Sequence, residues 1–247
     1  MSRPREQERI LREYRRREEE VDGDLYAPWN PAEDFMRAGR RRIAISLLRR
    51  SGTFPVAGRP VLEVGYGRIG WLSELLGWGL READLHGIEL DGERAAIARN
   101  ALPAADLRVG DAARLPWEGG TFQLTVASTV FTSILDDGLR RRVAAEIERT
   151  LAPGGALLWY DFRYDNPRNR GVRGISAAQL RALFPKLRGE VRSATLLPPL
   201  ARRLTPLGIL LPQLFEALPL LRSHLVAALV KAPGKDGSPP AGTPEPP

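Results

Sequence analysis

The chain has 247 residues, of which 43% are hydrophobic, and this is enough to bury one substantial core. It has no cysteine and only two histidines, which excludes disulfide scaffolds, thiolate metal sites and a histidine-rich metal cage, so we expect no bound metal. The net charge is +7, but residues 61–150 are acidic and residues 151–247 are basic. A charge divided in this way does not indicate general nucleic-acid binding, and we expect no nucleic-acid partner.

The sequence contains no segment that predicts a secretory leader or a membrane span. Its first twenty residues include seven arginines and no apolar run. No uninterrupted apolar stretch reaches the roughly 18 residues that a membrane-spanning helix needs. We therefore expect a cytoplasmic protein, and nothing in the sequence indicates its oligomeric state.

Residues 1–55 are predicted to form a helical extension that can also act as a lid. Residues 1–20 have the pattern of a charged helix with few apolar anchors, which we expect to be exposed to solvent. A loop with Tyr26 and Trp29 follows, and these aromatic side chains can close over a ligand. The next helix should begin at Pro31, because Asn30 can accept hydrogen bonds from its first N–H groups, and it should end near residue 50.

Apolar strands and amphipathic helices then alternate over residues 60–162. Strands are expected at residues 60–64, before residue 91, and at 106–109, 122–127 and 156–160, with a turn at 152–155 before the last. This order predicts an α/β fold with a doubly wound, mostly parallel sheet, and such sheets bind ligands beyond the carboxyl ends of their strands. We assign this domain to residues 56–232 and expect the Pro- and Gly-rich residues 233–247 to form a disordered tail.

A glycine-rich turn follows the first strand. Gly65 and Gly67 allow a tight turn and a close approach of the backbone to a ligand, and the segment 65–70 fits the dinucleotide pattern G-x-G-x-x-G. A nicotinamide enzyme is therefore one interpretation. Three acids, Glu63, Glu89 and Asp111, come at or near the ends of three strands and are poorly suited to a pyrophosphate. They suit a cationic ligand that carries a ribose diol and an adenine amine.

Four segments then suggest a family. They are Val61-Leu-Glu-Val-Gly-Tyr-Gly67, Gly87-Ile-Glu-Leu-Asp91, Gly110-Asp-Ala112 and Leu151-Ala-Pro-Gly-Gly155. In their order and spacing they resemble the successive motifs of class I S-adenosylmethionine-dependent methyltransferases. The resemblance implies a Rossmann-like, seven-stranded sheet that ends in an antiparallel hairpin, which would correspond to residues 191–197 and 224–231.

The same resemblance implies transfer of a methyl group from S-adenosylmethionine to a small-molecule acceptor. It implies that the glycine turn holds the methionine part of this cofactor, Glu89 the ribose, and Asp111 with Ala112 the adenine. The residues that we assign to cofactor binding are Glu63, Gly65, Tyr66, Gly67, Glu89, Leu90, Asp111, Ala112 and Ser128. The chain departs from the family pattern at two positions. The family often has glycine where Ile69 stands, and it usually has Asp where Gln123 stands, a difference that should affect cofactor binding little.

The acceptor side is less specified. Asp161 and Tyr160, at the end of the fifth strand, are the candidate bases for a hydroxyl acceptor, although an amine acceptor can need none. The residues that we assign to the acceptor are Tyr26, Thr132, Arg163, Arg168 and Arg170. Arginine binds phosphate and carboxylate groups well, so we expect an anionic or sugar-containing metabolite.

Other interpretations remain open at this point. The chain can also be a nicotinamide-dependent oxidoreductase, or a binding protein with the methyltransferase fold and no catalysis. Leucines recur near one face of residues 207–221, and we favour packing on the domain or a lid over peripheral membrane contact for this segment.

Overall fold

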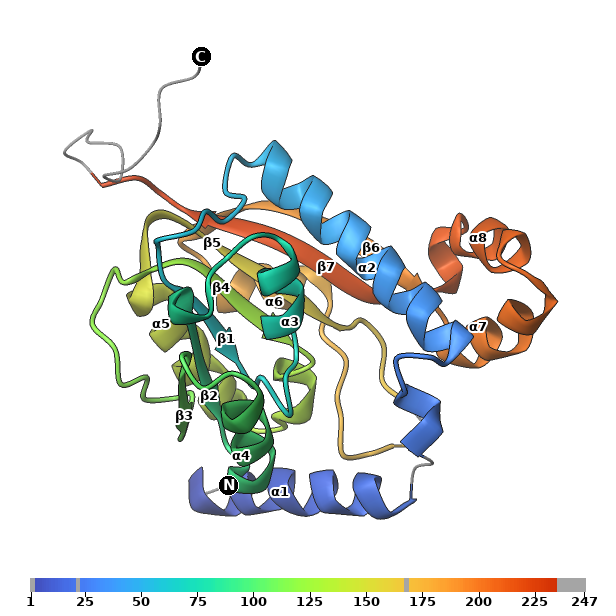
Figure 1. The fold of residues 1–247 in the computed structure, drawn as a ribbon, viewed down its shortest axis with the longest axis horizontal. Helices are drawn as coiled ribbons and strands as arrows, with labels where there is room; N and C mark the ends of the chain where they lie inside the picture. Colours follow the sequence, from blue (N-terminus) through green and yellow to red (C-terminus); the bar gives the residue numbers. More distant parts are fainter. Residues whose placement is uncertain (1–2, 21–22, 167–168, 235–247) are drawn as a thin grey trace.

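The computed structural model describes residues 3–20, 23–166 and 169–234. Its centre is a seven-stranded sheet with the order β3-β2-β1-β4-β5-β7-β6 (Figure 1). The strands are β1 (Val61–Val64), β2 (Leu85–Glu89), β3 (Asp106–Val109), β4 (Phe122–Ser128), β5 (Leu151–Phe162), β6 (Leu187–Leu196) and β7 (Arg222–Lys231). The first five are parallel, and β7 runs antiparallel to both β5 and β6. The expected fold class and its terminal hairpin are thereby confirmed.

Helices cover both faces of this sheet. They are α1 (Arg3–Glu20), α2 (Pro31–Arg50), α3 (Leu72–Gly77), α4 (Gly92–Ala101), α5 (Asp137–Thr150), α6 (Ala177–Leu183), α7 (Pro198–Leu204) and α8 (Leu210–Glu216). One apolar cluster joins α5 and α6 to one face of the sheet, and a second joins α2, α3 and α4 to the other. Successive β5 side chains alternate between them: Trp159 belongs to the first cluster and Tyr160 to the second.

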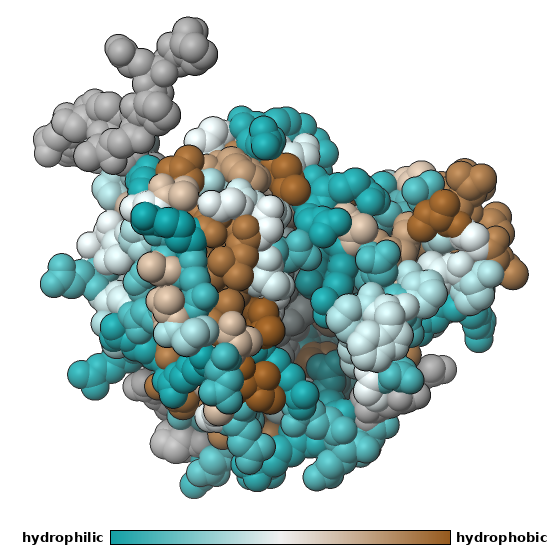
Figure 2. All heavy atoms as spheres, viewed as in Figure 1, coloured by the Kyte–Doolittle hydropathy of each residue, from teal (hydrophilic) through white to brown (hydrophobic). Residues whose placement is uncertain are grey.

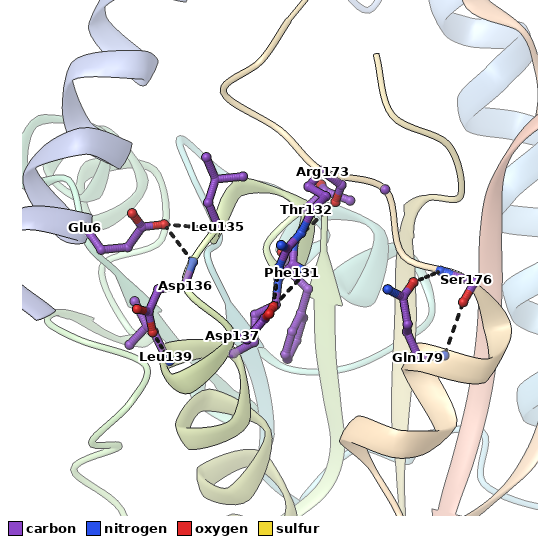
Figure 3. Close-up of polar contacts among 12 residues, drawn as sticks. Glu6, Phe131, Thr132, Leu135, Asp136, Asp137, Leu139, Arg173, Ser176 and Gln179 are labelled. Carbon is purple, nitrogen blue, oxygen red and sulfur yellow. Dashed lines mark hydrogen bonds and ion pairs between the residues drawn. The ribbon is translucent and has the colours of Figure 1, made fainter. Parts of the chain in front are cut away.

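Local sequence signals explain where the helices begin. The Asn30 side chain accepts hydrogen bonds from Ala32 N and Glu33 N, so α2 starts at Pro31 as expected. At α6, Ser176 and Gln179 form a reciprocal capping box (Figure 3). Gln123, which departs from the family pattern, holds the loop before β1: its amide donates to Val56 O and Arg59 O, each at 2.8 Å.

Three expectations need correction. Residues 1–20 are not a solvated helix, because Ile10 and Glu6 of α1 are buried against the domain. The turn expected at 152–155 lies inside β5, which begins at Leu151 because this residue pairs with Phe122 across an irregular step of the ladder. Residues 207–221 do not pack their leucines on the domain, since most of these side chains are exposed. The expected tail falls mainly on residues 235–247, which lie outside the described residues.

Candidate active site

The turn between β1 and α3 brings backbone N–H groups to the carboxyl edge of the sheet. Gly65 and Gly67 have φ angles of +71° and +59°, which side-chain-bearing residues rarely adopt. A Cβ atom at Gly65 would lie 2.8 Å from Cγ2 of Val130, whereas one at Gly67 would meet open space. Glycine is therefore needed at position 65 for both its backbone conformation and its packing.

Glu63, in β1, stabilises the end of this turn. Its carboxylate is buried and accepts from Trp71 N at 2.9 and 2.8 Å, at the start of α3, where no other side chain caps the helix. Burial raises the pKa of Glu63 to about 8. The Glu63 carboxyl group thus occupies the helix terminus where a dinucleotide would place its pyrophosphate, and its contact with a cofactor stays a prediction.

Two other acids lie at the next two strand ends. Glu89, at the end of β2, accepts from Gly67 N at 2.8 Å and from Asp91 N at 3.0 Å, so it joins the glycine turn to the start of α4. Asp111 follows β3, and its Oδ1 accepts from Ala113 N at 2.8 Å. Each carboxylate oxygen can accept a second hydrogen bond, which makes the pair suitable for the hydroxyl and amino groups of a ligand.

A cavity of about 60 Å³ connects these groups. Five predicted cofactor residues line it: Gly65, Glu89, Leu90, Asp111 and Ala112. Apolar side chains from the loop after β4 and from α5 complete its walls, among them Val130, Ile134, Leu139 and Val143. The space has room for a few water molecules and is smaller than a nucleoside, so a nucleoside can enter only if a wall moves outward.

The helix α1 forms one wall of the cavity. Gln7, Ile10 and Tyr14 face the cavity from this helix, which lies across one end of the domain (Figure 1). The buried Glu6 carboxylate accepts from Leu135 N at 2.6 Å and from Asp136 N at 3.4 Å (Figure 3). Arg9, which pairs with Glu6, donates to Ser133 O and Gly171 O. A short set of polar contacts thus holds α1 over the site.

The other end of α1 is held by charge. The guanidinium of Arg94, on α4, lies 4.2 Å from the centre of the Tyr14 ring and pairs with Glu18 at 2.9 Å. Burial and the nearby Glu89 carboxylate raise the pKa of Tyr14 to about 12, so its hydroxyl is neutral and can donate a hydrogen bond.

Asp161 lies deep beneath the loop after β4. It accepts from Phe131 N at 2.9 Å, from Thr132 N at 3.2 Å and from the Thr132 hydroxyl. Burial raises the pKa of Asp161 to about 6 even though these hydrogen bonds oppose the change. In this conformation Asp161 holds the loop in place and does not face the cavity, and the acceptor residue predicted at Thr132 is buried beside it.

Tyr160 points to the opposite face of the sheet. Its hydroxyl hydrogen-bonds to Oγ1 of Thr195 at 2.9 Å, and its ring stacks on His224 at 4.5 Å between centres. Burial raises the pKa of Tyr160 to about 12 and lowers that of His224 to about 3. These values keep both groups neutral, and neither side chain lines the cavity.

Comparison with known proteins agrees with this geometry. Residues 61–155 match the family model described as a methyltransferase domain. This part of the chain is similar to a methyltransferase domain. The match confirms the resemblance to class I S-adenosylmethionine-dependent methyltransferases, and it covers the glycine turn, Glu89 and Asp111.

The curated relatives match only part of the chain. The chain is 32% identical over 148 residues to a phthiotriol/phenolphthiotriol dimycocerosates methyltransferase of Mycobacterium tuberculosis, and the match covers 58% of this chain and 52% of that one. The chain thus spans about half the length of the curated relatives it matches.

Solved structures share the fold. An S-adenosylmethionine-dependent methyltransferase from Mesorhizobium loti is 16% identical with a TM-score of 0.57, over 79% of this chain and all of that one. A geranyl diphosphate C-methyltransferase from Streptomyces coelicolor is 17% identical with a TM-score of 0.54, over 76% of each chain.

The remaining predicted residues lie around the domain without converging on the cavity. Tyr66 is buried with its hydroxyl 3.3 Å from Arg108 O, so only its backbone can face a ligand, and Ser128 is half-buried at the end of β4. Tyr26 is exposed by 44%, and Arg163 lies over the Tyr164 ring at 4.5 Å. Arg170 is exposed, and Arg168 lies outside the described residues.

The sequence predicted residues 1–55 as a possible lid, but it did not single out the α1 residues that line the cavity. Ile10 and Tyr14 are four residues apart and therefore share one helix face, but their arginine- and glutamate-rich surroundings suggested a solvated helix. The signal that was available is this pair of apolar residues together with Glu6, which lies on the same face at one further turn.

Removal of residues 1–20 should weaken binding of S-adenosylhomocysteine by about ten-fold, because the apolar wall of Ile10 and Tyr14 is lost. Calorimetric titration measures the affinity, and a thermal melt should remain cooperative. The double variant Ile10→Ala/Tyr14→Ala should reproduce most of the loss, whereas Leu11→Ala on the same helix, outside the cavity, should not. Equal affinity in the parent, truncated and double-variant chains would show that α1 plays no part in binding.

Proposed function

We propose that the chain transfers a methyl group from S-adenosylmethionine to a small-molecule acceptor. The observation that carries the proposal is the joint placement of Gly65, Glu89 and Asp111 around one cavity at the carboxyl edge of a methyltransferase fold. The family match over residues 61–155 supports it independently.

The residues present fit this cofactor. Gly65 leaves room beside Val130 for a ligand to pass, and the Glu89 carboxylate, already fixed by Gly67 N and Asp91 N, can accept from a ribose diol. Asp111 can accept from an adenine amine, with Leu90 and Ala112 as apolar neighbours. When bound, S-adenosylmethionine supplies a methyl group on a positively charged sulfur, which is already activated for transfer.

The buried Glu63 carboxylate distinguishes this cofactor from a nicotinamide dinucleotide. A pyrophosphate at the start of α3 would need the N–H of Trp71, which Glu63 already occupies through both carboxylate oxygens. A pyrophosphate there would leave the buried Glu63 carboxyl group without its hydrogen-bond donor, which is costly. This contact supports the methyltransferase interpretation over the oxidoreductase.

The protein's catalytic contribution in this proposal is positioning. Holding the acceptor in line with the methyl group can supply roughly 7–11 kcal/mol of the barrier. Asp161 and Tyr160 are buried and hydrogen-bonded within the protein, so a role as base would need a change of conformation. An acceptor whose own nucleophile is unprotonated suits this arrangement best.

We further propose that the acceptor carries an anionic group. Arg163 and Arg170 belong to the segment that leaves the carboxyl end of β5, and Arg170 is exposed. The geranyl diphosphate methyltransferase with the same fold acts on a diphosphate, as its name states, which is consistent with this class of acceptor.

The test is transfer of a labelled methyl group to a panel of matched anionic and neutral small molecules. We expect incorporation into at least one anionic member, and Glu89→Gln should lower S-adenosylhomocysteine affinity roughly ten-fold through loss of a charged hydrogen-bond acceptor. Glu93→Gln, on the exposed first turn of α4, is the matched control and should change nothing. Tight cofactor binding without transfer to any member or to cell extract would favour a non-catalytic binding protein. Transfer to neutral members alone would contradict the proposal that the acceptor is anionic.

A further inference from the structure

A projecting segment of the chain exposes an unusual number of leucines. We define the leucine tip as residues 205–221, which comprise η4 (Thr205–Leu207), α8 and η5 (Pro219–Leu221). Its exposed apolar side chains are Leu207, Ile209, Leu210, Leu211, Leu214, Leu218 and Leu220. Four of these, Leu207, Leu210, Leu214 and Leu220, are exposed by 67–82%. Monomeric proteins rarely leave a contiguous apolar patch of this kind open to water without a partner.

The side of the leucine tip that faces the domain packs against α2 and α7. Phe215 and Leu221 pack on a small cluster that includes Phe35 and Met36 of α2 and Ala201 of α7. Arg222 donates to Glu216 O at 2.7 Å and Ala217 O at 3.2 Å, which satisfies carbonyl groups at the end of α8. The exposed leucines therefore belong to a folded element that holds them outward, away from the sheet (Figure 1).

The charged side chains around the tip are mainly arginines. Glu216 is the only acid in residues 198–221, and its Oε1 is buried near Gly39. Arg203 on α7 is exposed, and a groove of about 300 Å³ at the base of the tip is lined by Arg42, Arg192 and Arg222. Figure 2 shows the apolar atoms gathered at the outer end of this projection, with hydrophilic residues next to them.

Aromatic residues lie at the same margin. The Arg202 guanidinium of α7 is 6.0 Å from the centre of the Tyr26 ring, so the loop before α2 adjoins α7. Tyr26 and Trp29 in this loop are exposed by 44% and 76%. Leucines at the apex, with arginine and aromatic side chains behind them, are the composition of segments that lie in the interface of a membrane.

We propose that the leucine tip inserts into the surface of a bilayer that contains anionic phospholipids. Its short helical turns satisfy much of their own backbone hydrogen bonding, and the groove at its base is polar, which suits it poorly to an apolar peptide. The arginines supply the complementary charge for lipid phosphates. Within the described residues no helix is long and apolar enough to cross a bilayer, so the contact is confined to one leaflet.

The proposal is tested by co-sedimentation of the full chain with vesicles of phosphatidylcholine alone and of phosphatidylcholine with 30% phosphatidylglycerol. We expect binding to the anionic vesicles that weakens as salt rises. Leu210→Ser/Leu214→Ser should lower this binding roughly ten- to thirty-fold, because two exposed side chains can no longer enter the apolar region. Arg203→Ser should lower it about five-fold on anionic vesicles only.

The matched control is Val56→Ser/Ile97→Ser, which removes two exposed apolar side chains elsewhere and should leave vesicle binding unchanged. Failure of the parent chain to sediment with anionic vesicles would overturn the proposal. So would equal binding by the tip variant, or a tip-dependent dimer in analytical ultracentrifugation without vesicle binding. The assay needs neither cofactor nor acceptor, so its outcome is independent of the proposed methyl transfer.

Discussion

Gly65→Val should abolish measurable binding of S-adenosylhomocysteine, a loss of at least ~100-fold in affinity. The backbone at this position has φ = +71°, and the first added carbon would lie 2.8 Å from Cγ2 of Val130, at the wall of the cavity. A branched side chain would extend further toward the space between the glycine turn and the loop after β4. Calorimetric titration of the purified variant measures the loss.

The backbone strain of this change needs its own control. Gly79 has φ = +95°, and a Cβ there would meet nothing within 4 Å, so Gly79→Val carries a similar conformational cost away from the site. Both variants should melt at a lower temperature than the parent, but Gly79→Val should bind S-adenosylhomocysteine normally. Retained binding by Gly65→Val would mean that the cofactor does not pass this turn.

Asp161→Ala should lower the free energy of unfolding by about 3 kcal/mol or more, because several buried donors lose their acceptor. The groups affected are Phe131 N, Thr132 N and the Thr132 hydroxyl, which fix the loop after β4, and also Phe162 N. Urea denaturation measures the change. Asp165→Ala is the matched control, since this exposed aspartate accepts from Gly174 N and its loss should cost less than about 1 kcal/mol.

Asp161→Asn separates a structural role from a catalytic one. The amide oxygen can still accept from Phe131 N and Thr132 N, and the Thr132 hydroxyl can turn to accept from the new amide, although Phe162 N loses its acceptor. We therefore expect a small loss of stability and a turnover number within a few-fold of the parent. A folded Asp161→Asn chain whose turnover falls by several hundred-fold, with cofactor affinity intact, would instead support the predicted role of Asp161 as a base.

The sequence predicted the sheet well because its signals are local. Short apolar strands, the Asn30 cap and the glycine turn each depend on a few neighbouring residues, and all appear where expected. The edge of the sheet where we propose that the cofactor binds was also predictable, since parallel strands bring Glu89 and Asp111 to the same edge. The catalytic assignments remain predictions without support from the geometry, because the burial of Asp161 and Tyr160 depends on distant segments packing over them.

The two largest differences between the sequence-based expectations and the structure depend on how distant parts of the chain pack together. The helix α1 looked solvated because most of its residues are charged, yet Ile10 and Glu6 find partners more than one hundred residues away. The leucines of residues 207–221 looked like core, but the prolines and Gly208 divide the segment into short pieces that present them outward. Hydrophobic periodicity indicates that an apolar helix face will be covered. It does not indicate whether the covering surface is the rest of the domain or a separate partner.

The central claim is that Gly65, Glu89 and Asp111 form a site for S-adenosylmethionine, and calorimetric titration of the parent chain with S-adenosylhomocysteine and with NADH tests it most directly. We expect saturable, one-to-one binding of S-adenosylhomocysteine and no detectable binding of NADH, because the Glu63 carboxylate occupies the helix start that a pyrophosphate would need. Binding of NADH with no binding of S-adenosylhomocysteine would contradict the account.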